Sequence, residues 1–384
     1  MISRRELLKS AAGGLLLAGG ISALTACRGV KRDDVPNLDS DSVSVKGLSR
    51  DQVEILYLAS LAPSGHNTQP WTVKVLEPGH WLIGSARERW LPAVDPDNRE
   101  ILLSLGAFME NLVIAAGTFG LEVDLLITAG SPMEPNIADL RLKKGKATGF
   151  PVEKIKKRRT VRNGLGGVDL KREDLRYVMQ HDGEACLIAN APSPHAYYFS
   201  NNSREGRHLQ EGLIEANTIQ ASRVSAQEEL ARWIRWSNKD ARQYRNGLTP
   251  EGMEIGGIAG WYVRNFYNQS SVLTESFRKQ TVDRVVKQVK TCGGWLVVTS
   301  LGSEVPTLIA YGRAFERLFL KVRERGIALH PMTQMLEEKD RLKEEIARGL
   351  GVTGEVQWVL RMGYLETYPD PVSLRMPPDR FVLA

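Results

Sequence analysis

The sequence predicts an α+β protein built from two degenerate copies of one unit, and three observations support this. First, a glycine, a glutamate, a leucine and a second glycine recur at identical spacings in 106–120 and 312–326, offset by 206 residues. Second, strand-like apolar runs lie beside both segments. Third, 42% hydrophobic and 25% charged residues are ordinary for a globular domain and exclude collagen-like or wholly disordered chains.

The two matched segments are predicted helices because their apolar residues recur at helical intervals and each ends at a glycine suited to a helix C-terminus. The predicted strands beside them are 71–75 and 123–127 in the first half, and 295–300 and 356–362 in the second. Buried helices in unrelated proteins also look alike, so chance similarity stays open as the alternative. If the duplication is real, each half corresponds to one subunit of a two-fold dimer. A binding site at the interface would then draw on both halves, and only one of the two equivalent sites needs to stay functional.

The first 27 residues have the composition of an export signal: a basic start with Arg4 and Arg5, a short apolar stretch, and small residues before Cys27. The apolar stretch is short and glycine-rich for a membrane-spanning helix, which needs ~20 residues. S-R-R-E-L-L-K resembles a twin-arginine signal, and L-T-A-C resembles a lipobox. This implies export of the folded chain to the cell envelope and a membrane anchor on lipidated Cys27. The alternative is a cytosolic protein with a basic N-terminus that arose by chance.

Beyond the signal, residues 28–46 are polar and are predicted to be a flexible tether. The first half of the body is predicted at 47–150 and the second at 151–384, with an insertion at 203–268. The formal charge is +6, of which the signal carries +2. An excess this small does not indicate nucleic acid as a partner.

Three cysteines exclude a disulfide scaffold, and their spacing contains no zinc-type pair, so no metal site is expected. Cys186 and Cys292 lie in apolar surroundings in the sequence. We expect both to be small buried core residues.

The densest polar cluster is A-P-S-G-H-N-T-Q-P-W at 62–71. Pro63-Ser64-Gly65 is typical of a turn. The amides of Asn67 and Gln69 could pair with the donor–acceptor edge of a flavin or nucleobase, because each offers both a donor and an acceptor. An ordinary polar turn before a strand explains the same residues. His66 has no acidic or thiol partner at a fixed spacing, so we expect a loop histidine.

A second cluster is strongly basic, with six cations between Lys154 and Arg162. Such a run can bind phosphate, nucleic acid or an anionic membrane, or can be a solvated linker. No nucleic-acid-binding signature accompanies it. We therefore expect a small phosphorylated cofactor, since the forked guanidinium of arginine suits phosphate oxygens and Thr160 adds a hydroxyl donor.

Together these clusters resemble the nitroreductase family of flavin enzymes. The family's P-S-x-x-N-x-Q-P-W loop is similar to 62–71, its R-R-S-V-R motif to R-R-T-V-R at 158–162, and its closing R-x-G-Y…P…R-x-P pattern to 361–377. The resemblance covers about residues 50–384 and implies an α+β sandwich, active as a dimer, with FMN (flavin mononucleotide) at the interface. Ordinary members carry the arginine motif before the loop. The reversed order here resembles the double-length Acg-like branch of fused pseudo-dimers, thought to bind one FMN per chain.

The resemblance implies roles for individual residues. The phosphate and ribityl end of FMN would be held by Arg158, Arg159, Thr160 and Arg162, with help from Arg375. The flavin ring would be lined by Pro63, Ser64, Gly65 and Asn67, and approached at its N5 and pyrimidine side by Met332 and Thr333. No catalytic residue is assigned, because in such enzymes the flavin carries the hydride and the protein orients it.

Two functions follow from the resemblance. One is an FMN-dependent oxidoreductase that passes electrons from a small-molecule donor to a nitroaromatic, quinone or similar acceptor; NAD(P)H is scarce outside the cytoplasm, which favours another donor. The alternative is a non-catalytic FMN storage protein, with the insertion at 203–268 and its Trp233, Trp236 and Trp261 as a lid over the flavin. A lipoprotein that binds another phosphorylated ligand is a third possibility.

Overall fold

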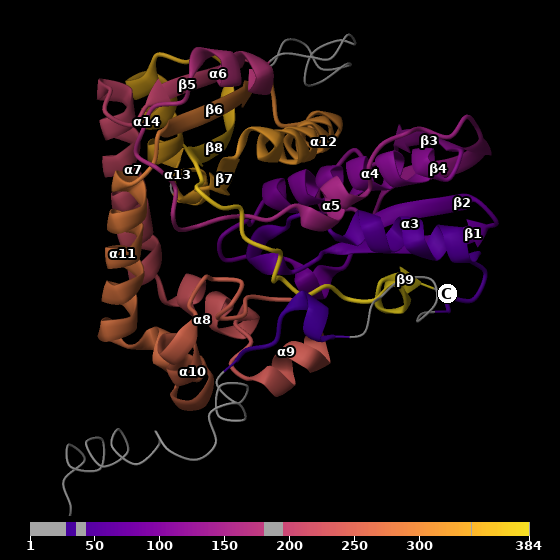
Figure 1. Ribbon diagram of the computed structural model, residues 1–384, viewed down its shortest axis with the longest axis horizontal. Helices are drawn as coiled ribbons and strands as arrows, with labels where there is room; N and C mark the ends of the chain where they lie inside the picture. Colours follow the sequence, from indigo (N-terminus) through magenta and orange to yellow (C-terminus); the bar gives the residue numbers. More distant parts are fainter. Residues whose placement is uncertain (1–27, 36–43, 180–194, 339, 384) are drawn as a thin grey trace, which may run out of the picture.

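The computed structural model describes residues 28–35, 44–179, 195–338 and 340–383. The predicted signal at 1–27, with Cys27, and also Cys186 lie outside the described residues. Two sheets, each covered by helices, meet along a pair of central helices, which confirms the predicted α+β class (Figure 1).

The first sheet has the strand order β3 (Leu121–Ile127), β4 (Asn136–Lys144), β2 (His80–Ser85), β1 (Trp71–Glu77) and β9 (Val382–Leu383). The neighbours among β1 to β4 are antiparallel, with Trp71 opposite Ser85 in the β1–β2 pair. The last strand, β9, comes from the far end of the chain and pairs parallel to β1, with Val73 opposite Val382. The C-terminus therefore completes the sheet of the N-terminal half.

The second sheet has the order β5 (His195–Ser200), β6 (Gly294–Ser300), β8 (Glu355–Tyr364) and β7 (Ile327–Pro331), and all neighbours are antiparallel. From one edge, the first sheet runs β3, β4, β2, β1 and the second runs β7, β8, β6, β5. The order is the same in both sheets once the strands are numbered within each half. A long buried helix also connects β2 to β3 in the first sheet and β6 to β7 in the second.

These two helices, α4 (Arg99–Thr118) and α12 (Val305–Val322), lie side by side at the centre of the molecule (Figure 1). They approach most closely at two glycines that occupy matched positions of the repeat. A Cβ atom on Gly312 would lie 2.1 Å from the carbonyl oxygen of Leu103, and one on Gly106 would lie 2.3 Å from that of Ile309. Only glycine allows this backbone contact. Part of α4 is apolar and long enough to span a membrane, but 78% of that window is buried, as in a core helix.

The remaining helices of the first half and the junction are α3 (Arg50–Ser60), α5 (Glu153–Lys157) and α6 (Arg172–Met179). Ser49 caps α3 by accepting a hydrogen bond from the Gln52 amide, and the Gln52 side chain accepts one from Ser49 in return. The other half adds α13 (Gln334–Glu337) and α14 (Asp340–Leu350) before β8.

A helical insertion separates β5 from β6, where the matching strands β1 and β2 are joined by a tight turn. It contains α7 (Arg204–Ser222), α8 (Val224–Trp233), α9 (Asn238–Tyr244), α10 (Gly257–Phe266) and α11 (Glu275–Lys290). The predicted lid segment 203–268 contains α7 to α10, and the helices continue beyond it through α11. In Figure 1 they line the left and lower sides of the molecule.

Residues 28–35, part of the predicted tether, are docked on the body. The Val30 amide donates to Asn238 Oδ1 at 3.2 Å, and Arg32 donates to the carbonyl of Ser373 at 3.1 Å. Val30 and Val35 are buried against Ala241 and Leu374. This differs from the expectation of a free segment, because the two valines in an otherwise polar stretch find an apolar partner surface beside α9.

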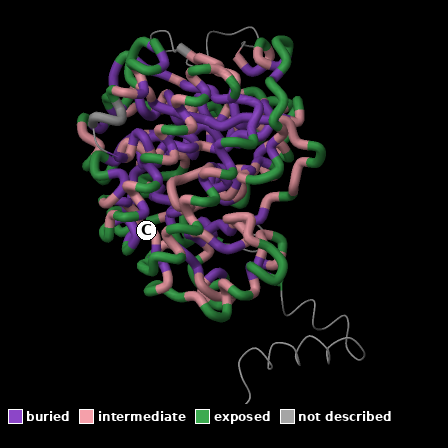
Figure 2. Tube along the Cα trace, turned by 90° about the vertical axis from the view of Figure 1, so that its left-hand side faces the viewer, coloured by how far each residue is buried: buried purple, intermediate pink, exposed green. Residues whose placement is uncertain are grey.

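Buried residues fill the centre of the molecule and exposed ones cover its outside (Figure 2). The main core surrounds α4 and α12 and reaches both sheets, and a second core lies between the second sheet, α7, α11 and α14. Cys292 is buried in this second core, as predicted, and burial raises the pKa of its thiol to about 12.

Candidate functional site

A cavity of about 770 Å³ lies between the two halves and the helical insertion. Its walls come from the loop at 63–66, from α4 and α12, from the segment 330–334 at the end of β7, and from α7, α8, α10 and α11. Seven of the eleven residues predicted to bind the cofactor line it: Pro63, Ser64, Gly65, Thr160, Arg162, Met332 and Thr333. Three distant parts of the sequence are thus brought together. Asn67, Arg158, Arg159 and Arg375 are not among its lining residues.

The loop before β1 has a backbone that local sequence does not favour. His66, Asn67 and Gln69 all have positive φ, at 48°, 53° and 54°, which is costly for residues other than glycine. The amides that were candidates for a flavin edge hold this conformation instead. Asn67 Nδ2 donates to the Gly247 carbonyl at 3.0 Å, and Gln69 Oε1 accepts from the Met376 amide at 2.9 Å.

Two of the predicted phosphate ligands brace the same loop from behind. Arg158 donates to the carbonyl of Leu61 at 2.7 Å. Arg375 donates to the carbonyls of Leu61 and Ala62, each at 3.1 Å, and to Asn67 Oδ1 at 2.9 Å. Both arginines are buried and therefore position the backbone that leads into Pro63.

The charge around these arginines is unbalanced. Arg32, Arg158 and Arg375 lie close enough to affect one another. The pKa of Arg375 is well below its usual value, chiefly because the side chain is buried and also because Arg32 and Arg158 repel its charge. Arg158 and Arg375 share one acid, Glu316, which lies 3.3 Å from Arg158 Nε. Burial raises the pKa of Glu316 to about 7. Among the described residues, Arg158 Nη1 and Arg375 Nε are buried without a hydrogen-bond partner. These arginines carry more positive charge than Glu316 balances and have unpaired N–H groups, and both properties are suited to binding a phosphate group.

Arg159 has an acidic partner from the insertion. Its Nη2 lies 3.0 Å from Glu254 Oε1, and the other oxygen of that carboxylate accepts from the Asn163 amide at 2.7 Å. The Glu254 carboxylate therefore accepts the hydrogen bond that Arg159 was expected to donate to a phosphate.

The cationic wall of the cavity is formed by Arg162 and the inner face of α11. Arg162 donates to the Gly252 carbonyl at 3.0 Å, and Arg284 of α11 lines the same cavity. Burial lowers the pKa of Arg162, and repulsion from Arg159 and Arg284 lowers it further. His330 also lines this region and is buried, so its pKa falls well below the usual value and the ring is neutral at pH 7.

Carboxyl groups also line the cavity. Glu337 Oε1 accepts from the Thr333 hydroxyl at 2.8 Å and its Oε2 accepts from Gln220 at 2.7 Å. Burial, reinforced by Glu100 across the cavity wall, raises the pKa of Glu337 to about 8. The Glu337 carboxyl therefore holds a proton at neutral pH. His66 is half-buried beside Glu100, and desolvation lowers its pKa to about 4, so the ring is neutral.

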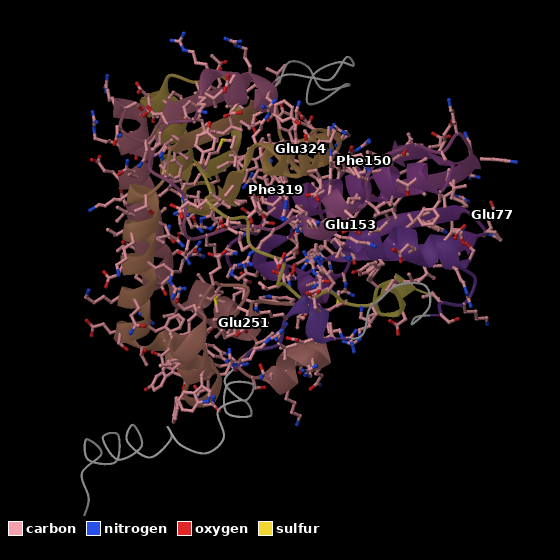
Figure 3. All side chains as sticks on the ribbon, viewed as in Figure 1. Glu77, Phe150, Glu153, Glu251, Phe319 and Glu324 are labelled. Carbon is pink, nitrogen blue, oxygen red and sulfur yellow. The ribbon has the colours of Figure 1, made fainter. Side chains whose placement is uncertain are left out.

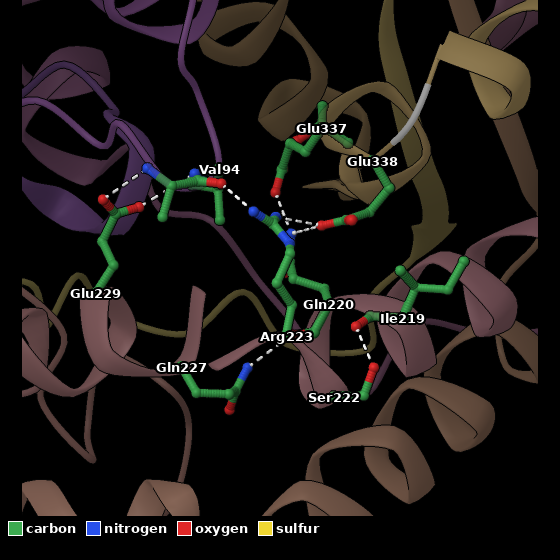
Figure 4. Close-up of polar contacts among 11 residues, drawn as sticks. Val94, Ile219, Gln220, Ser222, Arg223, Gln227, Glu229, Glu337 and Glu338 are labelled. Carbon is green, nitrogen blue, oxygen red and sulfur yellow. Dashed lines mark hydrogen bonds and ion pairs between the residues drawn. The ribbon is translucent and has the colours of Figure 1, made fainter. Parts of the chain in front are cut away.

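Polar contacts fasten the insertion over the cavity (Figure 4). Glu229 accepts from the amides of Ala93 and Val94 at 3.0 and 3.2 Å. Arg223 donates to the Ala93 carbonyl and to Glu338 Oε1, the latter at 2.6 Å. These contacts link α7 and α8 to the first half and to the end of α13, so the cavity wall is built from both halves.

The floor of the cavity is apolar and contains aromatic rings. Leu103 and Ala107 of α4 face it from the first half, and Phe315 and Trp358 from the second. The rings of Phe315 and Trp358 are stacked, with centroids 4.1 Å apart. An apolar wall with aromatic rings and a few polar groups is typical of a binding site for a small ligand.

The contribution of α11 to the cavity was not predicted from the sequence. Its cavity-facing residues follow one helical stripe: Phe277, Gln280, Thr281, Arg284, Val285 and Gln288. A helix that packs only against a core would have an apolar stripe here. The polar Gln280, Arg284 and Gln288 in this stripe were the signal of a cavity. Glu337 and Glu100 had no comparable signal, because only folding brings them near each other.

Replacing Glu337 by glutamine is expected to flatten the pH dependence of stability. A carboxyl whose pKa rises from 4.5 in the unfolded chain to about 8 in the folded chain binds extra protons in the native state, so stability falls as pH rises between these values. The slope is at most about 1.4 kcal/mol per pH unit. Denaturant unfolding of both chains across this range measures it. The exposed Glu366→Gln is the control and should keep the slope, and an unchanged slope in E337Q would contradict the assignment.

No protein-family model matches the chain. Two curated proteins from two strains of Mycobacterium tuberculosis, each named "Putative NAD(P)H nitroreductase", are 25% identical to it over 338 residues, covering 83% of this chain and 86% of theirs. A solved FMN-dependent nitroreductase, NfnB from Mycobacterium smegmatis in complex with NADPH, matches 56% of this chain and 86% of its own at 17% identity and a TM-score of 0.35. Iodotyrosine deiodinase bound to FMN and 3-iodo-L-tyrosine matches 58% and 94% at 15% identity and a TM-score of 0.34.

Proposed function

We propose that this chain is an FMN-dependent oxidoreductase of the nitroreductase family, which passes electrons from a small-molecule donor to a nitroaromatic, quinone or similar acceptor. The observation that carries the proposal is the convergence of Pro63–Gly65, Thr160 with Arg162, and Met332 with Thr333 on one cavity. The curated relatives, similar over most of the chain, support the same chemistry.

Bound FMN would supply the two-electron chemistry, and the protein would supply its position and surroundings. Thr160 and Arg162 would hold the polar end of the cofactor, because both line the cavity. Arg158 and Arg375 would add positive charge from behind the loop, because they are buried and do not line the cavity. The loop at 63–65 and the apolar floor suit the ring.

An acceptor that receives a hydride also needs a proton. Glu337 carries one at neutral pH and is hydrogen-bonded to Thr333 in the wall of the same cavity. We assign Glu337 as the group that holds this proton.

The proposal includes the arrangement of the chain. The segments 47–150 and 151–384 are two copies of one unit folded as an intrachain pseudo-dimer, with 203–268 as part of a lid. The equal strand order of the two sheets supports this, as does the contact between Gly106 and Gly312, since equivalent positions touch on a two-fold axis. Twin-arginine export to the cell envelope and a lipid anchor at Cys27 complete the proposal and rest on the sequence of residues 1–27.

The alternative is an FMN storage protein. The helices of the insertion cover the cavity and are fastened to both halves, which would restrict the entry of a large nicotinamide donor. Adding NADPH without oxygen separates the two: a flavin that NADPH does not reduce but dithionite does favours storage or another electron donor.

Replacing Arg162 by glutamine is expected to weaken FMN binding by ~10- to 100-fold, because a charge-assisted hydrogen bond contributes ~1.5–3 kcal/mol. The chain from residue 28 onward is purified, and its flavin content and FMN affinity are read from visible absorbance and fluorescence. Arg176→Gln, at an exposed position on α6, is the matched control and should keep the native affinity. Absence of flavin from the native chain would reject FMN as its cofactor, and full flavin retention in R162Q would remove Arg162 from the site.

A further inference from the structure

Helix α10 exposes an apolar stripe to solvent. Ile258, Tyr262 and Phe266 are 85%, 49% and 58% exposed, and their spacing of four residues places them on one face. The opposite face is satisfied within the protein, since Gly260 is buried and Arg264 forms an ion pair with Glu251. Three large apolar side chains exposed together on one helix are unusual for a surface that only meets water.

The N-terminal segment reaches the body beside this helix. Asn238, at the start of α9, donates to the Arg28 carbonyl at 3.2 Å. Gly29 lies directly against the Glu251 carboxylate that pairs with Arg264 of α10. Figure 3 shows Glu251 in the lower part of the molecule, near α8 and above α9 and α10 of Figure 1. The 27 residues with the anchor-like sequence therefore precede a point next to the exposed stripe.

The surface around this point is basic. Lys239 and Arg242 on α9 are exposed, as is Arg28, which forms an ion pair with Asp34 at 2.8 Å. Tyr244 at the end of α9 is 46% exposed. Aromatic and apolar side chains flanked by cations are what an anionic phospholipid surface attracts: the rings settle at the headgroup level and the cations meet the lipid phosphates.

The cavity opens at the same place. Of its lining residues, those that are exposed all lie on α10 or α11: Ile258, Ala259, Tyr262, Gln280 and Arg284. The rim is apolar on the α10 side and polar on the α11 side. Whatever covers the stripe of α10 therefore also borders the entrance to the site.

We propose that the stripe formed by Ile258, Tyr262 and Phe266 rests in the headgroup layer of a phospholipid membrane and turns the mouth of the cavity toward the bilayer. This inference rests on the proposed anchor at Cys27, and the stripe acts as a second membrane contact that orients the anchored protein. Reactants dissolved in the membrane then reach the cavity directly from it.

A second copy of the chain fits this surface less well. A stable dimer buries about 800 Å² on each partner, far more than three side chains on one helix provide. The surrounding Arg28, Lys239 and Arg242 would also face one another across such an interface.

The test uses the full chain reconstituted in vesicles of phosphatidylcholine and phosphatidylglycerol. Phe266 is replaced by cysteine and labelled with an environment-sensitive dye in a C186S background; Phe266 is not among the cavity-lining residues, so the label leaves the site open. The expected result is a blue-shifted emission that spin-labelled lipids quench. Leu301→Cys, 67% exposed at a distant position after β6, is the matched control and should stay in water. The C186S chain alone measures background labelling.

Emission from position 266 that matches the Leu301 control in an anchored chain would overturn the inference while leaving the anchor in place. A chain that remains in the soluble fraction would overturn both. A blue shift that appears without vesicles and grows with protein concentration would assign the stripe to self-association instead. The flavin absorbance of the same samples reports the proposed cofactor separately, so its loss cannot be confused with any of these outcomes.

Discussion

Gly312→Val is expected to destabilise the protein by about 3 kcal/mol or to prevent folding, because added atoms at a tightly packed position force apart what they touch. A Cβ atom at this position would lie 2.1 Å from the Leu103 carbonyl oxygen and 2.9 Å from its Cα. Both belong to the backbone of α4, so a change of rotamer cannot relieve the clash. The two central helices would have to separate, and both halves of the cavity wall would move with them.

Denaturant unfolding and the melting temperature measure this effect. Gly149→Ala is the matched control, because a Cβ atom at Gly149 has nothing within 4 Å. G149A should unfold at the native midpoint. A G312V chain with the native midpoint would show that α4 and α12 do not pack in this way.

Arg158→Met is expected to cost about 3–5 kcal/mol at neutral to alkaline pH, because it removes the cation nearest to the buried carboxylate of Glu316. Arg158 also donates to the Leu61 carbonyl, but Arg375 still holds that oxygen in the variant. The principal loss is therefore electrostatic. The double variant R158M/E316L should recover most of the stability, because it removes both buried charges and replaces them with apolar groups.

The destabilisation by R158M should grow as the pH rises. Burial already raises the pKa of Glu316 to about 7 while Arg158 lowers it, so removing Arg158 raises it further. At about pH 5 the variant keeps Glu316 protonated and neutral, and at about pH 8 the folded state must either ionise a buried acid or retain a proton against the solvent. The destabilisation by R158M should be larger at the higher pH and disappear in the double variant. Equal destabilisation at both values would show that the ion pair is not its cause.

Much of the fold followed from local patterns. The helices around Gly106 and Gly312 and the strands at 71–75, 123–127, 295–300 and 356–362 were predictable, because burial on one face or along a short run leaves a periodic signal in the sequence. The joining of β9 to β1 left no such signal. It pairs residues more than 300 positions apart, and a two-residue strand is too short for a pattern. The docking of residues 28–35 was missed for the same reason, since two valines in a polar segment do not reveal their partner surface.

The sequence by itself determined the residue types of the site. The loop at 62–71, the arginine motif at 158–162 and the pair at 332–333 carry their donors, cations and turns wherever the chain places them. The tertiary structure decided which of these residues face the cavity. Thr160 and Arg162 do, whereas Arg158, Arg159 and Arg375 point to Glu316, Glu254 and the Leu61 carbonyl. Those partners are 95 to 314 positions away in the chain, and a buried charge goes to whichever opposite charge or carbonyl the packing of the two halves brings within reach.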